Sequence, residues 1–113
     1  MHELSLCENI VVSIEEAALT EGFNIVTAVY IGIGQLSCVE PAALRFCFDP
    51  ATSGSIARNA QLFITVYPGL AKCKQCGASL EIENYYDACS CCESFDLDIT
   101  GGEEMQIESL EVA

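Results

Sequence analysis

Two cysteine pairs with C-x2-C spacing constrain the fold of this 113-residue chain more than any other feature. The first pair is Cys73-Lys-Gln-Cys76, and the second, Cys89-Ser-Cys-Cys92, follows after the 12 residues 77–88. Each pair places two sulfurs on one tight turn, and Gly77 lets the first turn bend until its amides face the sulfurs. Because Zn2+ accepts a closed tetrahedral shell of four thiolates without strain, the pairs predict a structural zinc site. The expected ligands are Cys73, Cys76, Cys89 and Cys92.

A bound iron and a pair of disulfides are the competing interpretations of these four cysteines. A disulfide framework is typical of short secreted chains, which carry a signal peptide. The segment Met-His-Glu-Leu-Ser-Leu at 1–6 has neither the basic region nor the long apolar stretch of such a peptide. We therefore expect a reduced, cytoplasmic protein in which a metal joins the two pairs.

The other four cysteines are expected to stay outside the metal site. Cys91 offers an alternative C-x-C pair with Cys89, but the x2 spacing repeats that of the first pair. Cys7, Cys38 and Cys47 lie in apolar segments, where isolated cysteines usually act as small buried hydrophobic residues. Cys91 is thus the expected spare thiol.

The charge balance is strongly acidic, with 17 Asp and Glu against four Lys and Arg and a formal net charge of −13. Such a field repels phosphate backbones, and the cysteine pairs offer only Lys72 and Lys74, so nucleic-acid binding is not expected. The acidic surface suits a basic protein partner or a cation, or serves solubility alone. No apolar stretch is long enough to cross a bilayer, so no membrane association is expected.

Hydrophobic spacing predicts the first two elements. Apolar residues recur at helical spacing over 4–21, which predicts an amphipathic helix that stops at Gly22. Residues 25–33 are rich in β-branched side chains and predict a strand, with the odd-numbered positions on one face.

Pro41 is placed to open a second helix as its first residue, and Asp49-Pro50 to end it. A loop at 52–55 then leads to a strand at 62–67. The helix is expected to turn four side chains inward: Leu44, Phe46, Cys47 and Phe48.

Glycines and prolines delimit the part of the chain that carries the cysteine pairs. Pro68-Gly69 breaks the preceding strand, and Gly101-Gly102 makes a flexible joint on the far side. Alternating apolar and polar residues predict a strand over 95–100. Residues 105–112 predict a last strand, whose imperfect alternation implies a bulge or a position buried on both faces. We expect this strand to return to the first sheet, which makes the metal-binding module an insertion.

The predicted fold class is therefore α+β, with a small sheet of about three strands, two helices and an inserted four-cysteine zinc-knuckle module. Residues 1–68 and 103–113 are expected to form the α+β domain, and residues 69–102 the zinc-binding module. The metal would compensate for a core too small to be stable by apolar burial alone.

Met1-His2-Glu3 is a second candidate metal site. It offers a free α-amine, two amide nitrogens, an imidazole and a carboxylate within three residues. The amine, the amides and the imidazole can form a planar set of four nitrogens, which favours Ni2+ or Cu2+ over tetrahedral Zn2+. A histidine that follows the first Met is, however, usually an exposed residue without a role. The residues alone leave both interpretations open.

Several segments together resemble the HypA/HybF family of hydrogenase maturation factors. They are Met-His-Glu-Leu-Ser-Leu at 1–6, Ile-Gly-Gln-Leu-Ser-Cys-Val-Glu at 33–40 with Ala-Leu-Arg-Phe at 43–46, and the cysteine pairs closed by Thr-Gly-Gly-Glu-Glu-Met at 100–105. The resemblance covers the whole chain. The Met-His-Glu start and the two C-x2-C pairs are specific to this family when they occur together, whereas either feature alone is not. The chain departs from the family pattern at Ser90-Cys91, where a proline or a charged residue is common. This leaves the ligands of the second pair slightly open.

The family it resembles consists of nickel metallochaperones that help insert Ni2+ into the large subunit of [NiFe]-hydrogenase. They work with the GTPase HypB, and some members also serve urease maturation. The resemblance implies that Met1 supplies its α-amine to nickel, His2 its imidazole and amide nitrogens, and Glu3 its amide and a carboxylate contact. It implies a weaker role for Glu40, as an axial or outer carboxylate. The four cysteines that match the family's zinc ligands are Cys73, Cys76, Cys89 and Cys92.

The implied function is a nickel metallochaperone with structural Zn2+ and labile Ni2+ cargo. The alternative is a zinc-ribbon protein-interaction module without a metal-delivery role, which would need no free N-terminus. An enzyme is not expected. His2 is the only histidine, so no Cys/His or Ser/His dyad forms away from the N-terminus, and a four-thiolate site leaves no open coordination position.

Overall fold

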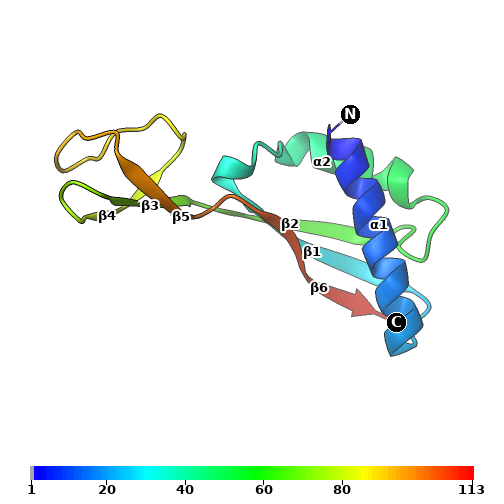
Figure 1. The fold of residues 1–113 in the computed structure, drawn as a ribbon. Coiled ribbons are helices and arrows are strands. Elements are labelled where there is room, and N and C mark those ends of the chain that lie inside the picture. The colour runs from blue at the N-terminus through cyan, green and yellow to red at the C-terminus, as the bar shows by residue number, and fades with distance from the viewer. Residues whose placement is uncertain (1) are drawn as a thin grey trace.

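The computed structural model describes residues 2–113. Within this range the chain forms two three-stranded sheets, the main sheet β2-β1-β6 and the small sheet β4-β3-β5. Figure 1 shows both helices on one side of the main sheet and the small sheet projecting away from it, in a molecule of 53 × 27 × 17 Å. The elements are α1 (His2–Glu21), β1 (Val26–Gly34), the 3-10 helix η1 (Gln35–Ser37), α2 (Pro41–Thr52), β2 (Gln61–Tyr67), β3 (Gly69–Cys73), β4 (Ser79–Ile82), β5 (Leu97–Gly101) and β6 (Met105–Val112).

Helix α1 contributes one face to the core of the main sheet. Its buried residues Cys7, Ile10 and Ile14 follow one another at spacings of three and four, the pattern of a single helix face. The helix ends where the sequence predicted. Gly22 has φ +80°, and its N–H donates to the Ala18 carbonyl oxygen at 2.8 Å. Within residues 2–113, no helix has both the length and the apolar content that crossing a bilayer requires.

Strand β1 lies at the centre of the main sheet, parallel to β2 and antiparallel to β6. Val29, Ile31 and Ile33 belong to the core that the sheet shares with both helices. The predicted face pattern is wrong at the start of the strand, where Val26 is 1% exposed and Ile25 is 55% exposed. A register shift directly after Val26 reverses the alternation there.

Helix α2 begins at Pro41, as predicted. Leu44 and Phe48 are buried and Cys47 packs against the same core, but the prediction that Phe46 turns inward is wrong, because Phe46 is 83% exposed. Positions 44 and 48 are four residues apart and share a helix face, whereas position 46 lies on the far side.

The prediction that Asp49-Pro50 ends α2 is also wrong, because the helix continues to Thr52. Pro50 lies in the last turn, so its missing N–H removes a single helical hydrogen bond. The Thr52 hydroxyl donates to the Phe48 carbonyl oxygen at 2.9 Å and adds a bond in the same turn. The chain then turns over 53–59 and enters β2, which confirms the strand predicted at 62–67.

Strand β6 returns to the main sheet and pairs with β1, as the sequence predicted. Its register shifts between its partners Tyr30 and Ile31, which confirms the expected bulge. The small sheet therefore stands between two strands of the main sheet in the sequence. The α+β fold with two helices is confirmed, while β3 and β4 had no clear signal in the sequence pattern.

Three glycines form the junction between the two sheets. A Cβ on Gly34 would overlap the carbonyl oxygen of Gly102, and a Cβ on Gly69 would lie 2.8 Å from Cγ of Leu36. The Gly34 N–H donates to the Glu104 carbonyl oxygen and the Leu36 N–H to the Gly102 carbonyl oxygen, both at 2.8 Å. This close approach lets the chain leave the main sheet at η1 and place Leu36 in the core of the small sheet.

Gly34→Ala is expected to destabilise the protein by about 2 kcal/mol or more, because the added Cβ forces two backbones apart. Gly54→Ala is the matched control. A Cβ on Gly54 meets no atom within 4 Å, so its effect should stay below about 0.5 kcal/mol. Urea and thermal unfolding of the metal-loaded proteins measure both changes. Equal stability of the two variants would contradict this role of the junction.

Candidate metal centre

The first cysteine pair lies on the turn that ends β3. Cys73 is the last residue of the strand, and its N–H donates to the Ala78 carbonyl oxygen at 2.9 Å. Its carbonyl oxygen accepts a hydrogen bond from the Gly77 N–H, also at 2.9 Å. Gly77 has φ +77°, a left-handed conformation that glycine adopts without strain. These bonds close a tight turn that carries the sulfurs of Cys73 and Cys76.

The second cysteine pair lies on a turn with the same two backbone hydrogen bonds. The Cys89 N–H donates to the Ser94 carbonyl oxygen, and the Glu93 N–H donates to the Cys89 carbonyl oxygen, both at 2.8 Å. Glu93 has φ +64°, so it takes the left-handed position that Gly77 takes in the first turn. The sequence carried no signal for this equivalence, because glutamate does not favour that conformation.

The Sγ atoms of Cys73, Cys76, Cys89 and Cys92 all lie within 4.8 Å of one another. Those of Cys73 and Cys92 are 3.5 Å apart, and those of Cys76 and Cys89 are 3.7 Å apart. Four sulfurs placed tetrahedrally about 2.3 Å from a zinc ion would be about 3.8 Å apart, so the set fits a metal ion of that size. The four cysteines therefore form a site able to hold a structural metal.

Cys91 lies outside this set and contributes its backbone instead of its exposed thiol. The Cys91 N–H donates to Sγ of Cys89 at 3.4 Å, and the Cys76 N–H donates to Sγ of Cys73 at 3.5 Å. Hydrogen bonds from the backbone of Cys92 and Cys91 lower the pKa of Cys89 to about 6. The backbone of Cys76 likewise lowers the pKa of Cys73. Both sulfurs are thus favoured as thiolates, the form that binds metal.

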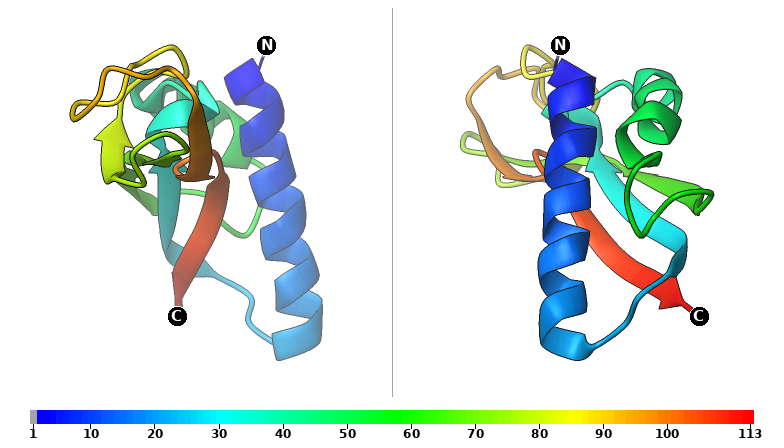
Figure 2. Two further views of the ribbon diagram at one scale, coloured as in Figure 1. Left: turned by 60° about the vertical axis from the view of Figure 1, so that its left-hand side comes forward. Right: turned by 90° about the vertical axis from the view of Figure 1, so that its right-hand side faces the viewer.

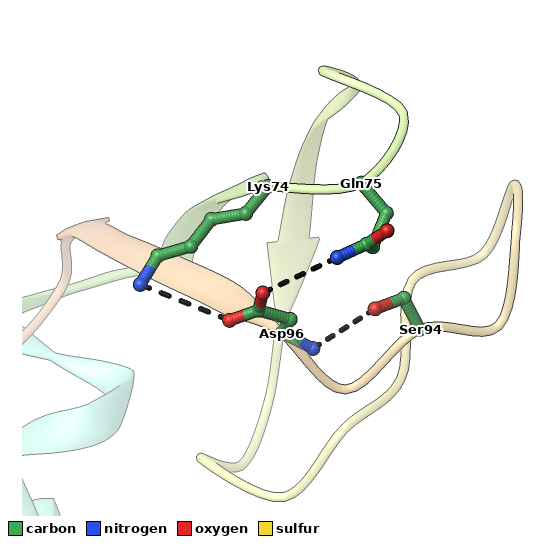
Figure 3. A network of polar contacts seen from close by, with 4 residues as sticks. All are labelled: Lys74, Gln75, Ser94 and Asp96. Carbon is green, nitrogen blue, oxygen red and sulfur yellow. Dashed lines mark hydrogen bonds and ion pairs between the residues drawn. The ribbon is translucent and has the colours of Figure 1, made fainter.

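Asp96 joins the two turns through the polar contacts drawn in Figure 3. Its carboxylate accepts a hydrogen bond from Nε2 of Gln75 at 3.4 Å and lies 3.8 Å from Nζ of Lys74, and both residues belong to the first turn. Its N–H donates to the hydroxyl oxygen of Ser94, just after the second turn, at 3.0 Å. An exposed ion pair of this kind adds little stability, but the set of contacts orients the turns. The cysteine spacing did not point to Asp96.

The small sheet has a minor apolar core. Its buried cluster consists of Leu36, Ala71 and Ile82, against which Leu80, Leu97 and Ile99 pack while partly exposed. A core of this size does not stabilise a sheet alone, so a metal at the four sulfurs would supply much of the folding free energy. Leu36 comes from η1, and the small core therefore includes a residue next to the main sheet.

Two residues expected at the N-terminal metal site lie side by side. The Glu40 N–H donates to Oε2 of Glu3 at 3.4 Å, so the first turn of α1 meets the start of α2. The Glu40 carboxylate caps α2 by accepting a hydrogen bond from the Ala42 N–H at 3.3 Å. Met1 lies outside the described residues, and His2 is described as the first residue of α1 without its side chain.

The isolated cysteines differ in burial. The prediction that the isolated cysteines are buried is confirmed for Cys7, which is 0% exposed. Its thiol donates to the Leu44 carbonyl oxygen at 3.5 Å. Burial, together with the nearby Cys47, raises the pKa of Cys7 to about 11. The prediction is wrong for Cys38, which is exposed. Its backbone has φ +63° where the chain leaves η1, and the side chain of Cys38 therefore stays out of the core.

Known proteins of similar sequence and structure point to one family. The family model described as HypA, hydrogenase/urease nickel incorporation, metallochaperone, matches residues 1–112. The chain belongs to the HypA family. The hydrogenase maturation factor HypA of Bradyrhizobium sp. (strain ORS 278) is 49% identical, and that of Azotobacter chroococcum mcd 1 is 46% identical. Each of these alignments spans 112 residues and 99% of both chains.

Solved HypA structures share the fold. The solution structure of the Ni metallochaperone HypA from Helicobacter pylori matches with a TM-score of 0.71 at 27% identity, over 97% of this chain and 96% of that one. A second HypA solution structure matches with a TM-score of 0.72 at 27% identity, over 100% and 97% of the two chains. The resemblance noted in the sequence is confirmed, and the protein is a member of a nickel metallochaperone family.

Cys92→Ser is expected to weaken metal binding about 100-fold or more and to unfold the small sheet, because it removes one of four thiolates. Cys91→Ser changes the neighbouring thiol but keeps the N–H that faces Cys89, so it should retain one metal per chain. Metal content after dialysis against a chelator, with thermal unfolding, measures both. Metal loss from Cys91→Ser alone would assign the C-x-C pair as ligands.

Proposed function

We propose that this protein is a nickel metallochaperone that binds Ni2+ at Met1, His2 and Glu3, with Glu40 close by. It helps deliver the metal to the large subunit of [NiFe]-hydrogenase. The observation that carries the proposal is the contact between Glu3 and Glu40, which gathers two acidic residues where α1 begins. Membership of the HypA family supports nickel as the cargo.

The start of α1 suits a site built from backbone nitrogens. The first four N–H groups of an α-helix have no acceptor within the helix, so the amides of His2 and Glu3 are free to exchange their protons for a metal. The positive end of the helix dipole opposes a bound cation, and the carboxylates of Glu3 and Glu40 offset that effect. Such a balance fits a cargo site, which has to hold its metal and also release it.

The two sites differ in chemistry, and we assign them different metals. Amine, amide and imidazole nitrogens favour Ni2+, whereas four thiolates in a tetrahedral set favour Zn2+. A closed shell at Cys73, Cys76, Cys89 and Cys92 leaves no open position, so the zinc has a structural role in the module 69–102. Residues 1–68 and 103–113 are then the nickel-binding domain.

The proposed partners are an HypB-type GTPase and the hydrogenase large subunit in the cytoplasm, with urease maturation factors as further candidates. Their support is the family's role in nickel incorporation. Catalysis forms no part of the proposal, because the chain has one histidine, His2, and four of its eight cysteines belong to the closed set. The competing candidate is a zinc-ribbon interaction module that delivers no metal.

Adding three Gly residues before Met1 is expected to weaken nickel binding about 100-fold or more, because it moves the α-amine out of the chelate and leaves every side chain unchanged. A single added Gly would not serve, since it makes His2 the third residue and rebuilds a planar set of four nitrogens. The matched control carries three Gly residues after Ala113 and should bind like the native chain. Isothermal titration of nickel into zinc-loaded protein measures all three. Equal binding by both extended chains would favour the interaction module over the metallochaperone.

Nickel affinity is also expected to fall at least about tenfold between about pH 7.5 and about pH 6, because imidazoles titrate near pH 6.5. Amide coordination releases protons as well, so acid competes with the metal at each nitrogen. Titration of the native chain at both pH values tests this, with zinc content measured in parallel. An unchanged nickel affinity would exclude His2 and the amides as ligands.

A further inference from the structure

The main sheet has one face that neither helix covers. Figures 1 and 2 show α1 and α2 on the same side of the sheet, where Ile31 and its neighbours form the core. On the opposite side, the parallel register sets Tyr30 beside Phe63 and brings Tyr67 alongside β1. Phe63 is 41% exposed and Tyr67 is 44% exposed. We call this surface the open face, and the residues that define it are Tyr30, Gly32, Phe63, Tyr67, Glu108 and Glu111.

Stacking and hydrogen bonds hold the aromatic rings of the open face in place. The rings of Tyr30 and Phe63 stack with their centroids 4.8 Å apart and 13° between their planes. The Tyr30 hydroxyl donates to Oε2 of Glu111 at 2.9 Å, and the Tyr67 hydroxyl donates to Oε2 of Glu108 at 2.6 Å. These hydrogen bonds raise the pKa of both tyrosines, which remain neutral donors. A surface ordered in advance loses little conformational entropy on binding a partner.

A hollow of about 430 Å³ lies on the open face beside Tyr67, where the two sheets meet. Glycines of β1 and of the junction line it, together with the side chains of Tyr67 and Glu108. A Cβ on Gly32 would lie 2.7 Å from Cε2 of Tyr67 and 2.9 Å from Oε2 of Glu108. The bare backbone at Gly32 is thus what allows the Tyr67 ring to cross β1 and reach Glu108 on β6.

The open face is negatively charged. None of the four Lys and Arg residues is among the residues that line the hollow. Arg45 instead donates to the Leu62 carbonyl oxygen, and Lys74 pairs with Asp96 in the small sheet. The net charge of −13 disfavours nucleic acids and a second copy of this chain as occupants. Four carboxylates belong to the open face and the hollow: Glu103, Glu104, Glu108 and Glu111.

We propose that the open face docks an arginine-rich segment of a protein partner. A guanidinium can stack on the Tyr67 ring while it donates to the Glu108 carboxylate, which combines a cation–π contact with a charge-assisted hydrogen bond. The stack of Tyr30 and Phe63 offers apolar surface to the aliphatic stem of a second arginine.

A metal ion suits the open face less well than a guanidinium does. The carboxylates of Glu108 and Glu111 already accept hydrogen bonds from tyrosine hydroxyls, whereas a hard cation needs six or so oxygen ligands free to converge on it. The surface lies across the sheet from α1, so the proposal does not depend on nickel binding at Glu3 and Glu40.

The test is a titration of hexa-arginine peptide into ¹⁵N-labelled, metal-loaded protein, followed by amide chemical shifts. The largest shifts are expected at Gly32, Tyr67 and Glu108. Glu108→Gln keeps an oxygen for the Tyr67 hydroxyl but removes the charge, and it should weaken peptide binding about threefold or more. Tyr67→Leu should have a similar effect. Glu16→Gln removes the same charge from an exposed position of α1 and should change the affinity by less than about 1.5-fold.

Four results would overturn the proposal. Shifts spread evenly over the acidic surface, or equal weakening by Glu108→Gln and Glu16→Gln, would show that the peptide responds to net charge alone. Shifts on the open face caused by Ca2+ without peptide would identify a cation site. Shifts there that grow as the free protein is concentrated would identify a second copy of the chain as the occupant.

Discussion

The close packing of glycine backbones between the two sheets is the constraint on which the rest of the structure depends. Strands β2 and β6 flank β1 in the main sheet, and the chain between them leaves that sheet at Pro68-Gly69 and returns to it at Gly102, beside the end of β1. Gly34, Gly69 and Gly102 let the outgoing and returning backbones touch there, which side chains would prevent. Gly102, which the sequence assigned to a joint between the two parts of the chain, thus lies in a packed contact with Pro68 and Gly69.

The junction also links the two candidate metal sites. Leu36 packs in the core of the small sheet, and only residues 37–39 separate it from Glu40, whose N–H meets the Glu3 carboxylate. A metal at the four sulfurs would order the sheet around Leu36 and so limit where Glu40 lies. Tyr85 makes a second contact between the cysteine-bearing segment and the junction. Its hydroxyl donates to Oε2 of Glu103, the residue after Gly102, at 2.6 Å.

Features governed by a single residue or a short spacing were predictable from the sequence. Gly22 ends α1 and Pro41 begins α2 through their own backbone properties, and the C-x2-C spacing predicted four cysteines close enough to share a metal. Features decided by distant partners were not predictable. The contact of Glu3 with Glu40, for example, joins residues 37 positions apart. Only the family resemblance placed those two glutamates in one site.

The central claim is that one chain holds two metals through different atoms, with nickel as cargo on nitrogen and oxygen and zinc fixed on sulfur. X-ray absorption at the nickel and zinc edges of one sample loaded with both metals tests it most directly. We predict four sulfur neighbours at about 2.3 Å around zinc and only nitrogen and oxygen neighbours around nickel. Sulfur in the nickel shell, or nickel that displaces zinc from the four cysteines, would contradict the claim.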